Sequence, residues 1–142
     1  MTPPFLDAKI RTSFANQSMM ATLGARMAEF GPGHARIECP ILPGARQQDG
    51  FGHAGLTFAI GDSAAGYAAL TLMPEEVEVL TAEMKINLLA PATGDRLVAT
   101  GKVIRPGRRL IVVSAEITAE SGGDSTLIAL MQGTMIPMHP RG

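Results

Sequence analysis

Asp62 is the residue whose surroundings most clearly suggest chemistry. It is the only formally charged side chain between Asp49 and Glu75, and it lies in an Ala-rich segment typical of a buried helix. Burying an unpaired carboxylate costs several kcal/mol or raises its pKa. Two interpretations follow: Asp62 is a general base or nucleophile that faces a cleft, or its carboxylate points to water from an exposed strip of the helix.

His53 stands where the same helix is expected to begin, and Ala54 and Gly55 follow it. A helix start offers unpaired backbone N–H groups and the positive end of the helix dipole. The N–H groups of Ala54 and Gly55 could therefore polarise a carbonyl and stabilise the oxyanion formed from it. In the alternative interpretation, His53 caps the helix and the neighbouring glycines make the turn.

The spacing of His53 and Asp62 decides how they could act together. Asp62 is nine positions after His53, and a helix rises about 13 Å over that length, so they do not touch within one chain. If two such helices packed antiparallel across a dimer axis, the start of one would lie beside the middle of the other. A site that uses both residues is therefore expected to form between two subunits.

Hydrophobic periodicity and turn residues predict the elements that position these residues. We expect a helical leader over about 1–20, a hairpin with strands at 23–30 and 34–41, a loop over 42–52, and one buried helix over 53–73 that Pro74 ends. The next strand, 81–89, alternates with period two. One face of it carries Ala82, Met84, Ile86 and Leu88, and the other carries Thr81, Glu83, Lys85 and Asn87.

Three more alternating strands are expected, over 94–104, 110–120 and 125–135, and the last has Leu127, Ala129, Met131 and Met135 on its apolar face. Turns at 91–95, 105–109 and 121–125 would join the last four strands as antiparallel neighbours. The predicted fold is α+β, a curved antiparallel sheet of five or six strands wrapped around one long central helix. Such a sheet leaves an edge and a flank of the helix uncovered, which predicts pairing with a second copy.

Composition limits the classes of protein that fit. The 142 residues are enough for one domain, and 46% of them are hydrophobic. Twelve basic and thirteen acidic residues provide no field that would attract nucleic acid or an acidic membrane surface. The lone cysteine, Cys39, cannot form an intramolecular disulfide, and no Cys/His cluster has zinc spacing, so we expect no metal site and a cytoplasmic location.

Three segments, 50–66, 80–117 and 128–136, together resemble the hotdog-fold acyl-CoA thioesterases of the PaaI-like, phenylacetate-degradation branch. They begin GFGHAGLTF, LTAEMKINLLAPATGD and IALMQGTMI, and the resemblance extends from about residue 20 to 138. The family helix typically begins with His-Gly-Gly and carries Asp nine residues after the His. A strand with Ser or Thr near its start follows that helix.

The resemblance implies a role for each matching residue. Asp62 would activate water or attack the thioester carbonyl directly, and the backbone N–H of Ala54, where the family usually has Gly, would bind the carbonyl oxygen. His53 would position the thioester, Gly55 would contact it, and Thr81 would help to hold the water or substrate. Gln47, or Gln48 beside it, stands where the family often has Asn six residues before the His.

Arg105, Arg108 and Arg109 cluster in one predicted turn. The resemblance places this region near the entrance for the nucleotide part of coenzyme A, whose phosphates suit guanidinium groups. The alternative is a solvated hairpin tip, since Pro106 and Gly107 explain the turn by themselves.

The function expected from the resemblance is hydrolysis of small or medium acyl-CoA thioesters, aryl groups included, to the free acid and CoA. No cofactor is expected, because CoA is part of the substrate, and the assembly would be a homodimer that pairs into a tetramer. The absence of Gly-x-Ser-x-Gly removes another common thioesterase design. An acyl-CoA hydratase would need an Asp–His pattern that this sequence lacks. A non-catalytic protein that binds acyl-CoA or acyl carrier protein stays open, because Ala54 and Gln47 depart from the family.

Overall fold

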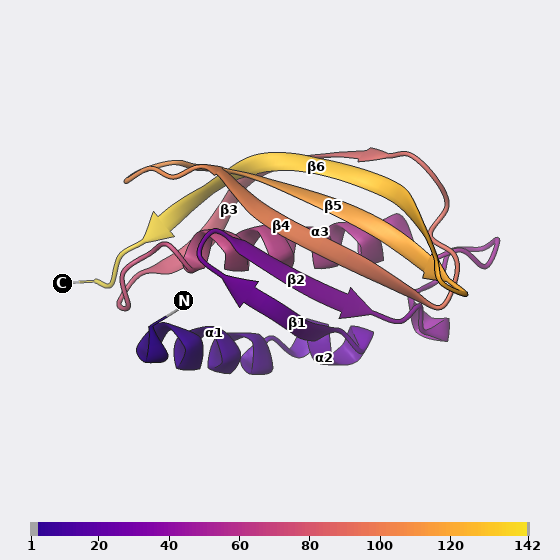
Figure 1. Cartoon of the computed structure of the whole chain (residues 1–142), viewed down its shortest axis with the longest axis horizontal. Coiled ribbons are helices and arrows are strands. Elements are labelled where there is room, and N and C mark those ends of the chain that lie inside the picture. Colours follow the sequence, from indigo (N-terminus) through magenta and orange to yellow (C-terminus); the bar gives the residue numbers. More distant parts are fainter. Residues whose placement is uncertain (1–2, 142) are drawn as a thin grey trace.

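One long helix, α3 (Ala54–Leu70), lies along the concave side of a six-stranded antiparallel sheet (Figure 1). The computed structural model describes residues 3–141. The sheet has the order β1-β2-β4-β5-β6-β3. Its strands are β1 (Arg26–Gly31), β2 (His34–Cys39), β3 (Glu78–Leu88), β4 (Arg96–Arg105), β5 (Ile111–Ser121) and β6 (Asp124–Met138). The predicted α+β architecture, a curved sheet around one central helix, is confirmed.

The predicted connection between β3 and β4 is wrong. These strands are not neighbours: β3 pairs with β6 at the edge of the sheet, and β4 pairs with β2 and β5. Residues 89–95 carry the chain from that edge strand to the middle of the sheet, so 91–95 is not a hairpin turn. Alternating hydrophobicity defines the two faces of a strand but not its partner, which is why the sequence pattern missed this crossing.

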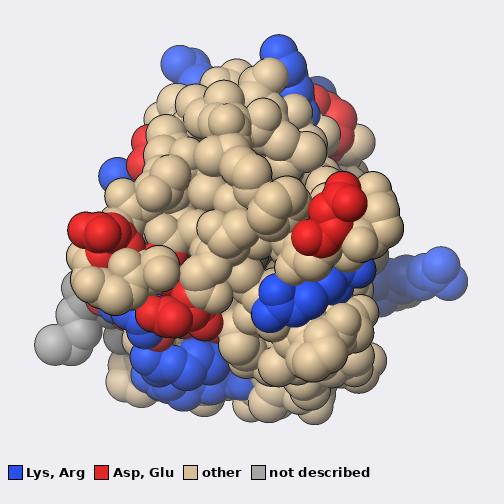
Figure 2. All heavy atoms as spheres, turned by 90° about the vertical axis from the view of Figure 1, so that its right-hand side faces the viewer, with Lys and Arg blue, Asp and Glu red and all other residues tan. Residues whose placement is uncertain are grey.

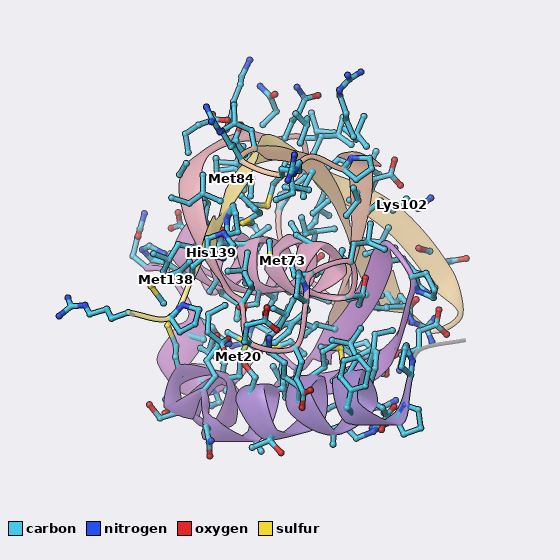
Figure 3. All side chains as sticks on the ribbon, turned by 90° about the vertical axis from the view of Figure 1, so that its left-hand side faces the viewer. Met20, Met73, Met84, Lys102, Met138 and His139 are labelled. Atoms are coloured by element: carbon cyan, nitrogen blue, oxygen red, sulfur yellow. The ribbon has the colours of Figure 1, made fainter. Side chains whose placement is uncertain are left out.

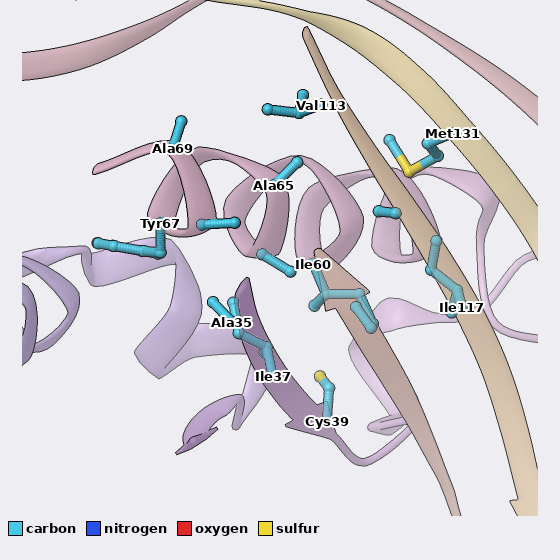
Figure 4. Packing of buried hydrophobic residues seen from close by; sticks show 14 of the residues in the cluster. Ala35, Ile37, Cys39, Ile60, Ala65, Tyr67, Ala69, Val113, Ile117 and Met131 are labelled. Carbon is cyan, nitrogen blue, oxygen red and sulfur yellow. The ribbon is translucent and has the colours of Figure 1, made fainter. Parts of the chain in front are cut away.

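The core is formed where the sheet closes around α3. Figure 4 shows this packing, with Ile60 and Ala65 of α3 among side chains of β2, β5 and β6. On β4, Gly101 lies against the backbone of α3, because an added Cβ there would overlap main-chain atoms of Ala64 and Ala65. Burial on most sides explains why the helix sequence is apolar nearly all round.

Two β-bulges change which side chains face the helix. In β3 the register with β6 shifts between Thr81 and Glu83, so Thr81 lies on the same inner face as Met84 rather than beside Glu83. In β6 a second shift leaves Leu127 40% exposed and buries Ile128, contrary to the predicted apolar set. A bulge adds one residue to one strand and thereby re-aims the side chains that follow it.

The N-terminal segment is helical and closes the open side of the curled sheet. It forms α1 (Pro4–Asn16) and α2 (Ser18–Leu23), and Leu6, Ile10 and Met20 are buried. Figure 3 shows α1 beneath α3, with Met20 in the layer between them. On one side the Arg11 guanidinium lies 5.1 Å from the centre of the Phe30 ring in β1. On the other, Lys9 Nζ donates to carbonyls of the connection before β3.

The remaining segment between β2 and α3 is a loop, as expected, with one short 3₁₀ turn at Pro43–Ala45. Seen from the end where β5 turns into β6, the surface is largely uncharged, with acidic and basic side chains in a few small groups (Figure 2). Across residues 3–141, we find no helix with both the length and the hydropathy needed to span a membrane.

Candidate active site

Asp62 lies on the flank of α3 that the sheet leaves uncovered. Gly55, Ala59, Asp62 and Ser63 follow one another at helical spacing, and all are at least partly exposed, whereas most of α3 is buried. The Thr81 hydroxyl on β3 donates a hydrogen bond of 2.7 Å to Asp62 Oδ1. The bulge in β3 makes this bond possible, because it turns Thr81 toward the helix.

A cavity of about 220 Å³, the Asp62 cavity, opens beside this carboxylate. It runs along α3 from Asp62 to Leu70 and lies between that helix, the start of β3 and the α1–α2 junction. Glu78 is the other carboxylate that lines it, and no Lys, Arg or His among residues 3–141 does. A cavity of about 150 Å³ holds a benzene molecule, so this one has room for a small acyl group.

Burial raises the pKa of the Asp62 carboxyl above its ordinary value, and the hydrogen bond from Thr81 opposes that shift more weakly. Desolvation disfavours the charged form, whereas a donor that binds the carboxylate favours it. The result is a carboxylate that is more basic than an exposed Asp and held in one orientation. Such a group can take a proton from water or attack an electrophilic carbon.

His53 is the N-cap of α3, and its Nδ1 accepts a hydrogen bond of 2.8 Å from the Gly55 N–H. Gly55 therefore does not offer a free donor, contrary to the expectation that both N–H groups could face a carbonyl. The Ala54 N–H has no acceptor among residues 3–141. Among the described residues, the free donor at the start of α3 is thus the amide of Ala54.

The free N–H of Ala54 lies at an open groove of about 370 Å³, the Ala54 groove, which Gln47, His53 and Leu88 also line. Gln47 Oε1 accepts from the backbone N–H groups of Asp49 and Phe51, so this side chain shapes the loop before the helix. Gln48 is exposed and does not line the groove. Of the two glutamines considered from the sequence, Gln47 is the one placed beside His53.

The Asp62 cavity and the Ala54 groove are separate within one chain. They share no lining residue, and Asp62 is eight positions after Ala54 on the helix, a rise of about 12 Å. The three arginines are also apart: Arg105 ends β4, Arg108 and Arg109 follow in the exposed turn, and none lines either hollow. Asp62 and Thr81 thus lie together at one cavity, and His53, Ala54 and Gln47 lie together at the other. Within one chain these two sets of residues are apart.

Sequence reasoning missed five polar residues of the Asp62 cavity: Ser13, Gln17, Ser63, Tyr67 and Glu78. Ser63 and Tyr67 are four residues apart on α3, next to Asp62, so the helical spacing could have indicated them. Ser13 and Gln17 belong to the N-terminal segment, and no pattern in the sequence connects that segment with a helix some 50 residues later.

A model of the thioesterase superfamily matches residues 49–126 of this chain. A candidate esterase of Saccharolobus solfataricus is 32% identical over 134 residues, which cover 94% of this chain and 87% of that protein. The match includes both groups of candidate residues.

Solved structures show the same fold. A thioesterase family protein from Silicibacter pomeroyi is 43% identical, with a TM-score of 0.93 over 95% of this chain and 99% of its own. The E. coli PaaI protein, from the phenylacetic acid degradation operon, is 21% identical, with a TM-score of 0.84 over 100% of this chain and 97% of its own. At 21% identity, the likeness to the E. coli PaaI protein shows a shared fold and no more. Together these findings confirm the predicted resemblance to hotdog-fold thioesterases.

Proposed function

The chain belongs to the thioesterase superfamily, and from this premise we propose that it hydrolyses small acyl-CoA thioesters to a free acid and CoA at a site shared by two subunits. Thioester hydrolysis as such follows from the family: the chain is a thioester hydrolase. The acyl-CoA substrate, the roles of the residues and the two-chain site are our proposal.

The environment of the Asp62 carboxylate is the observation that supports the proposal most strongly. Its carboxylate is half-buried, has a raised pKa, and is oriented by Thr81 at the mouth of a cavity of acyl size. As a general base it takes a proton from water while the water oxygen bonds to the thioester carbon. The resulting oxyanion accepts a hydrogen bond from the Ala54 N–H. The C–S bond then breaks, and the proton that Asp62 took from water passes to the leaving sulfur. In the alternative route Asp62 attacks the carbon itself, the C–S bond breaks and CoA leaves as the thiolate. Water then attacks the Asp62 carbonyl of the mixed anhydride, which releases the acid, restores the carboxylate and supplies the proton that the thiolate takes up.

The free edge of the sheet supports a site built by two chains. Within residues 3–141, β3 is paired on one side only, and it exposes Leu80 and Leu88 by 48% and 54%. If β3 pairs antiparallel with β3 of a second copy about a two-fold axis near its middle, Thr81 comes opposite the partner's Leu88. Thr81 binds Asp62, and Leu88 lines the Ala54 groove. The same pairing would thus bring the two hollows together twice per dimer.

The remaining site residues complete this proposal. His53 holds the helix start in place through Gly55, and Gln47 shapes the wall of the groove next to it. Arg105, Arg108 and Arg109 are exposed and would bind CoA phosphates, since guanidinium groups pair well with phosphate. Two such dimers would associate into a tetramer.

Release of free thiol from a panel of aryl, short and medium acyl-CoAs tests the proposal. We expect saturable turnover by the wild type and its loss in the Asp62→Asn variant. Saturable binding of acyl-CoA without thiol release would favour the non-catalytic alternative. A single turnover in ¹⁸O-labelled water separates the two routes, because only the nucleophilic route leaves the label in the Asp62 carboxylate.

A further inference from the structure

A larger hollow adjoins the Asp62 cavity. An open groove of about 710 Å³ runs beside α1, where Lys9, Thr12 and Asn16 line it. The two hollows have four lining residues in common, which are Ser13, Gln17, Tyr67 and Glu78. These four residues therefore form the wall between the small cavity at the carboxylate and the larger groove.

Gln17 crosses this wall and is hydrogen-bonded at both ends of its amide. Ser63 Oγ donates to Gln17 Oε1 at 3.0 Å, and Gln17 Nε2 donates to the Tyr67 hydroxyl at 3.1 Å. The Tyr67 hydroxyl is also 3.1 Å from Ser13 Oγ. We call Gln17, with Ser63 and Tyr67 as its two partners, the Gln17 barrier. A side chain bound at two points keeps one orientation, so the barrier does not swing open freely.

Helix α1, which ends just before Gln17, is firmly attached. The Phe14 and Tyr67 rings pack edge to face with their centres 5.8 Å apart. Lys9, whose side chain is only 12% exposed, donates to the carbonyls of Pro74, Glu75 and Val77 and lies 4.0 Å from Glu78. The N-terminal helices thus act as a fixed wall of the Asp62 cavity.

From this arrangement we propose that Gln17 is a specificity-determining residue that limits the length of the acyl group. The inference rests on the proposed function, in which the thioester carbon lies at Asp62. The cavity on the Asp62 side of Gln17 holds about 220 Å³, and Gln17, bound to Ser63 and Tyr67, separates it from the groove beside α1, so an acyl chain that grows from Asp62 toward that groove meets Gln17. Short acyl groups fit in front of the barrier, and longer ones do not. Without the amide, the chain would continue into the groove beside α1.

The test compares kcat/KM for butyryl-CoA and octanoyl-CoA in the wild type and in Gln17→Ala. We expect the octanoyl-to-butyryl ratio to rise about tenfold or more, because pocket changes of a few methylene groups produce effects of this size. Gln17→Met, which keeps a side chain of similar length in the wall, should retain the wild-type ratio. Asn16→Ala is the matched control, since Asn16 lines only the outer groove.

Ser63→Ala provides a second test that does not depend on how well Gln17→Ala folds. It frees one end of the barrier, and alanine suits a helix at least as well as serine. We expect a smaller shift of the ratio in the same direction. An octanoyl-to-butyryl ratio that stays within about twofold of wild type in both alanine variants would overturn the role of Gln17, while wild-type turnover would leave the proposed function intact. If the wild type hydrolyses neither thioester, the proposed function itself fails.

Discussion

The two sides of α3 differ in how closely they are packed. Toward the sheet, the helix approaches β4 so closely that Gly101 has no room for a Cβ beside Ala64 and Ala65. On the opposite flank Asp62 is only half covered, and a cavity separates the helix from β3 and α1. Close packing fixes the helix, and the fixed helix can then hold a partly desolvated carboxylate next to empty space. The predictions below test this contrast from the largest expected effect to the smallest.

Asp62→Asn should abolish thioester hydrolysis at the Asp62 cavity with little effect on the fold. We expect kcat to fall about 10³-fold, because the amide cannot take a proton from water or attack the thioester carbon. Steady-state thiol release measures the loss, and thermal unfolding confirms that the variant is folded. Turnover close to that of the wild type would show that Asp62 is not the catalytic group.

Gly101→Ala should damage the packed side instead. Its Cβ would overlap the backbone of α3, which cannot move away without displacing the helix, so we expect a loss of about 3 kcal/mol in the free energy of unfolding. Denaturant unfolding measures the change. A variant as stable as the wild type would mean that helix and sheet are not in backbone contact.

Thr81→Val should reduce turnover about tenfold, because it removes the hydrogen bond that orients the Asp62 carboxylate. Since that bond lowers the pKa of Asp62, its loss should also move the acidic limb of the pH–rate profile to higher pH. Thr134→Val is the matched control: Thr134 donates to Glu83 at the same 2.7 Å distance but on an exposed part of the β3–β6 pair. Equal effects of the two substitutions would argue against a specific role for Thr81.

The raised pKa of Asp62 also predicts a dependence of stability on pH. The folded state binds the proton more tightly than the unfolded state, so stability falls as pH rises from the ordinary pKa of Asp through the raised one. Activity runs in the opposite direction, since it needs the ionised form, and increases over the same window. Asp62→Asn should therefore be more stable than the wild type at neutral pH, and that advantage should vanish in acid. A constant stability difference at every pH would contradict this.

Gly66→Ala should have the smallest effect on the free energy of unfolding, and it is the counterpart of Gly101→Ala. Gly66 lies inside α3 on the cavity side, and an added Cβ would meet Met135 Cε at an ordinary 3.8 Å. Alanine should therefore stabilise the helix by about 0.5–1 kcal/mol. Denaturant unfolding of the two glycine variants side by side should give opposite signs. Destabilisation by both would mean that the flank is as tightly packed as the sheet side.

Sequence patterns predicted the features that depend on local chemistry. The apolar run of α3, the alternation in β5 and the position of His53 at the helix start were all predicted correctly, because each follows from the period of its own element. The position of β3, the inward turn of Thr81 and the barrier at Gln17 were not. Each depends on a partner distant in the chain: β6 for the first two, and α3 for Gln17.

Complementation between two inactive variants tests most directly whether two chains share the site. Ala54→Pro removes only the free N–H, since proline is favoured at the first helical position and His53 already has the extended backbone that precedes proline, with ψ of 144°. Co-refolding this variant with Asp62→Asn gives mixed dimers in which one of the two sites is intact. If each site combines Asp62 of one chain with Ala54 of the other, an equimolar mixture should recover about a quarter of wild-type turnover, because half of the dimers are mixed. A mixture as inactive as either variant alone would contradict the shared site.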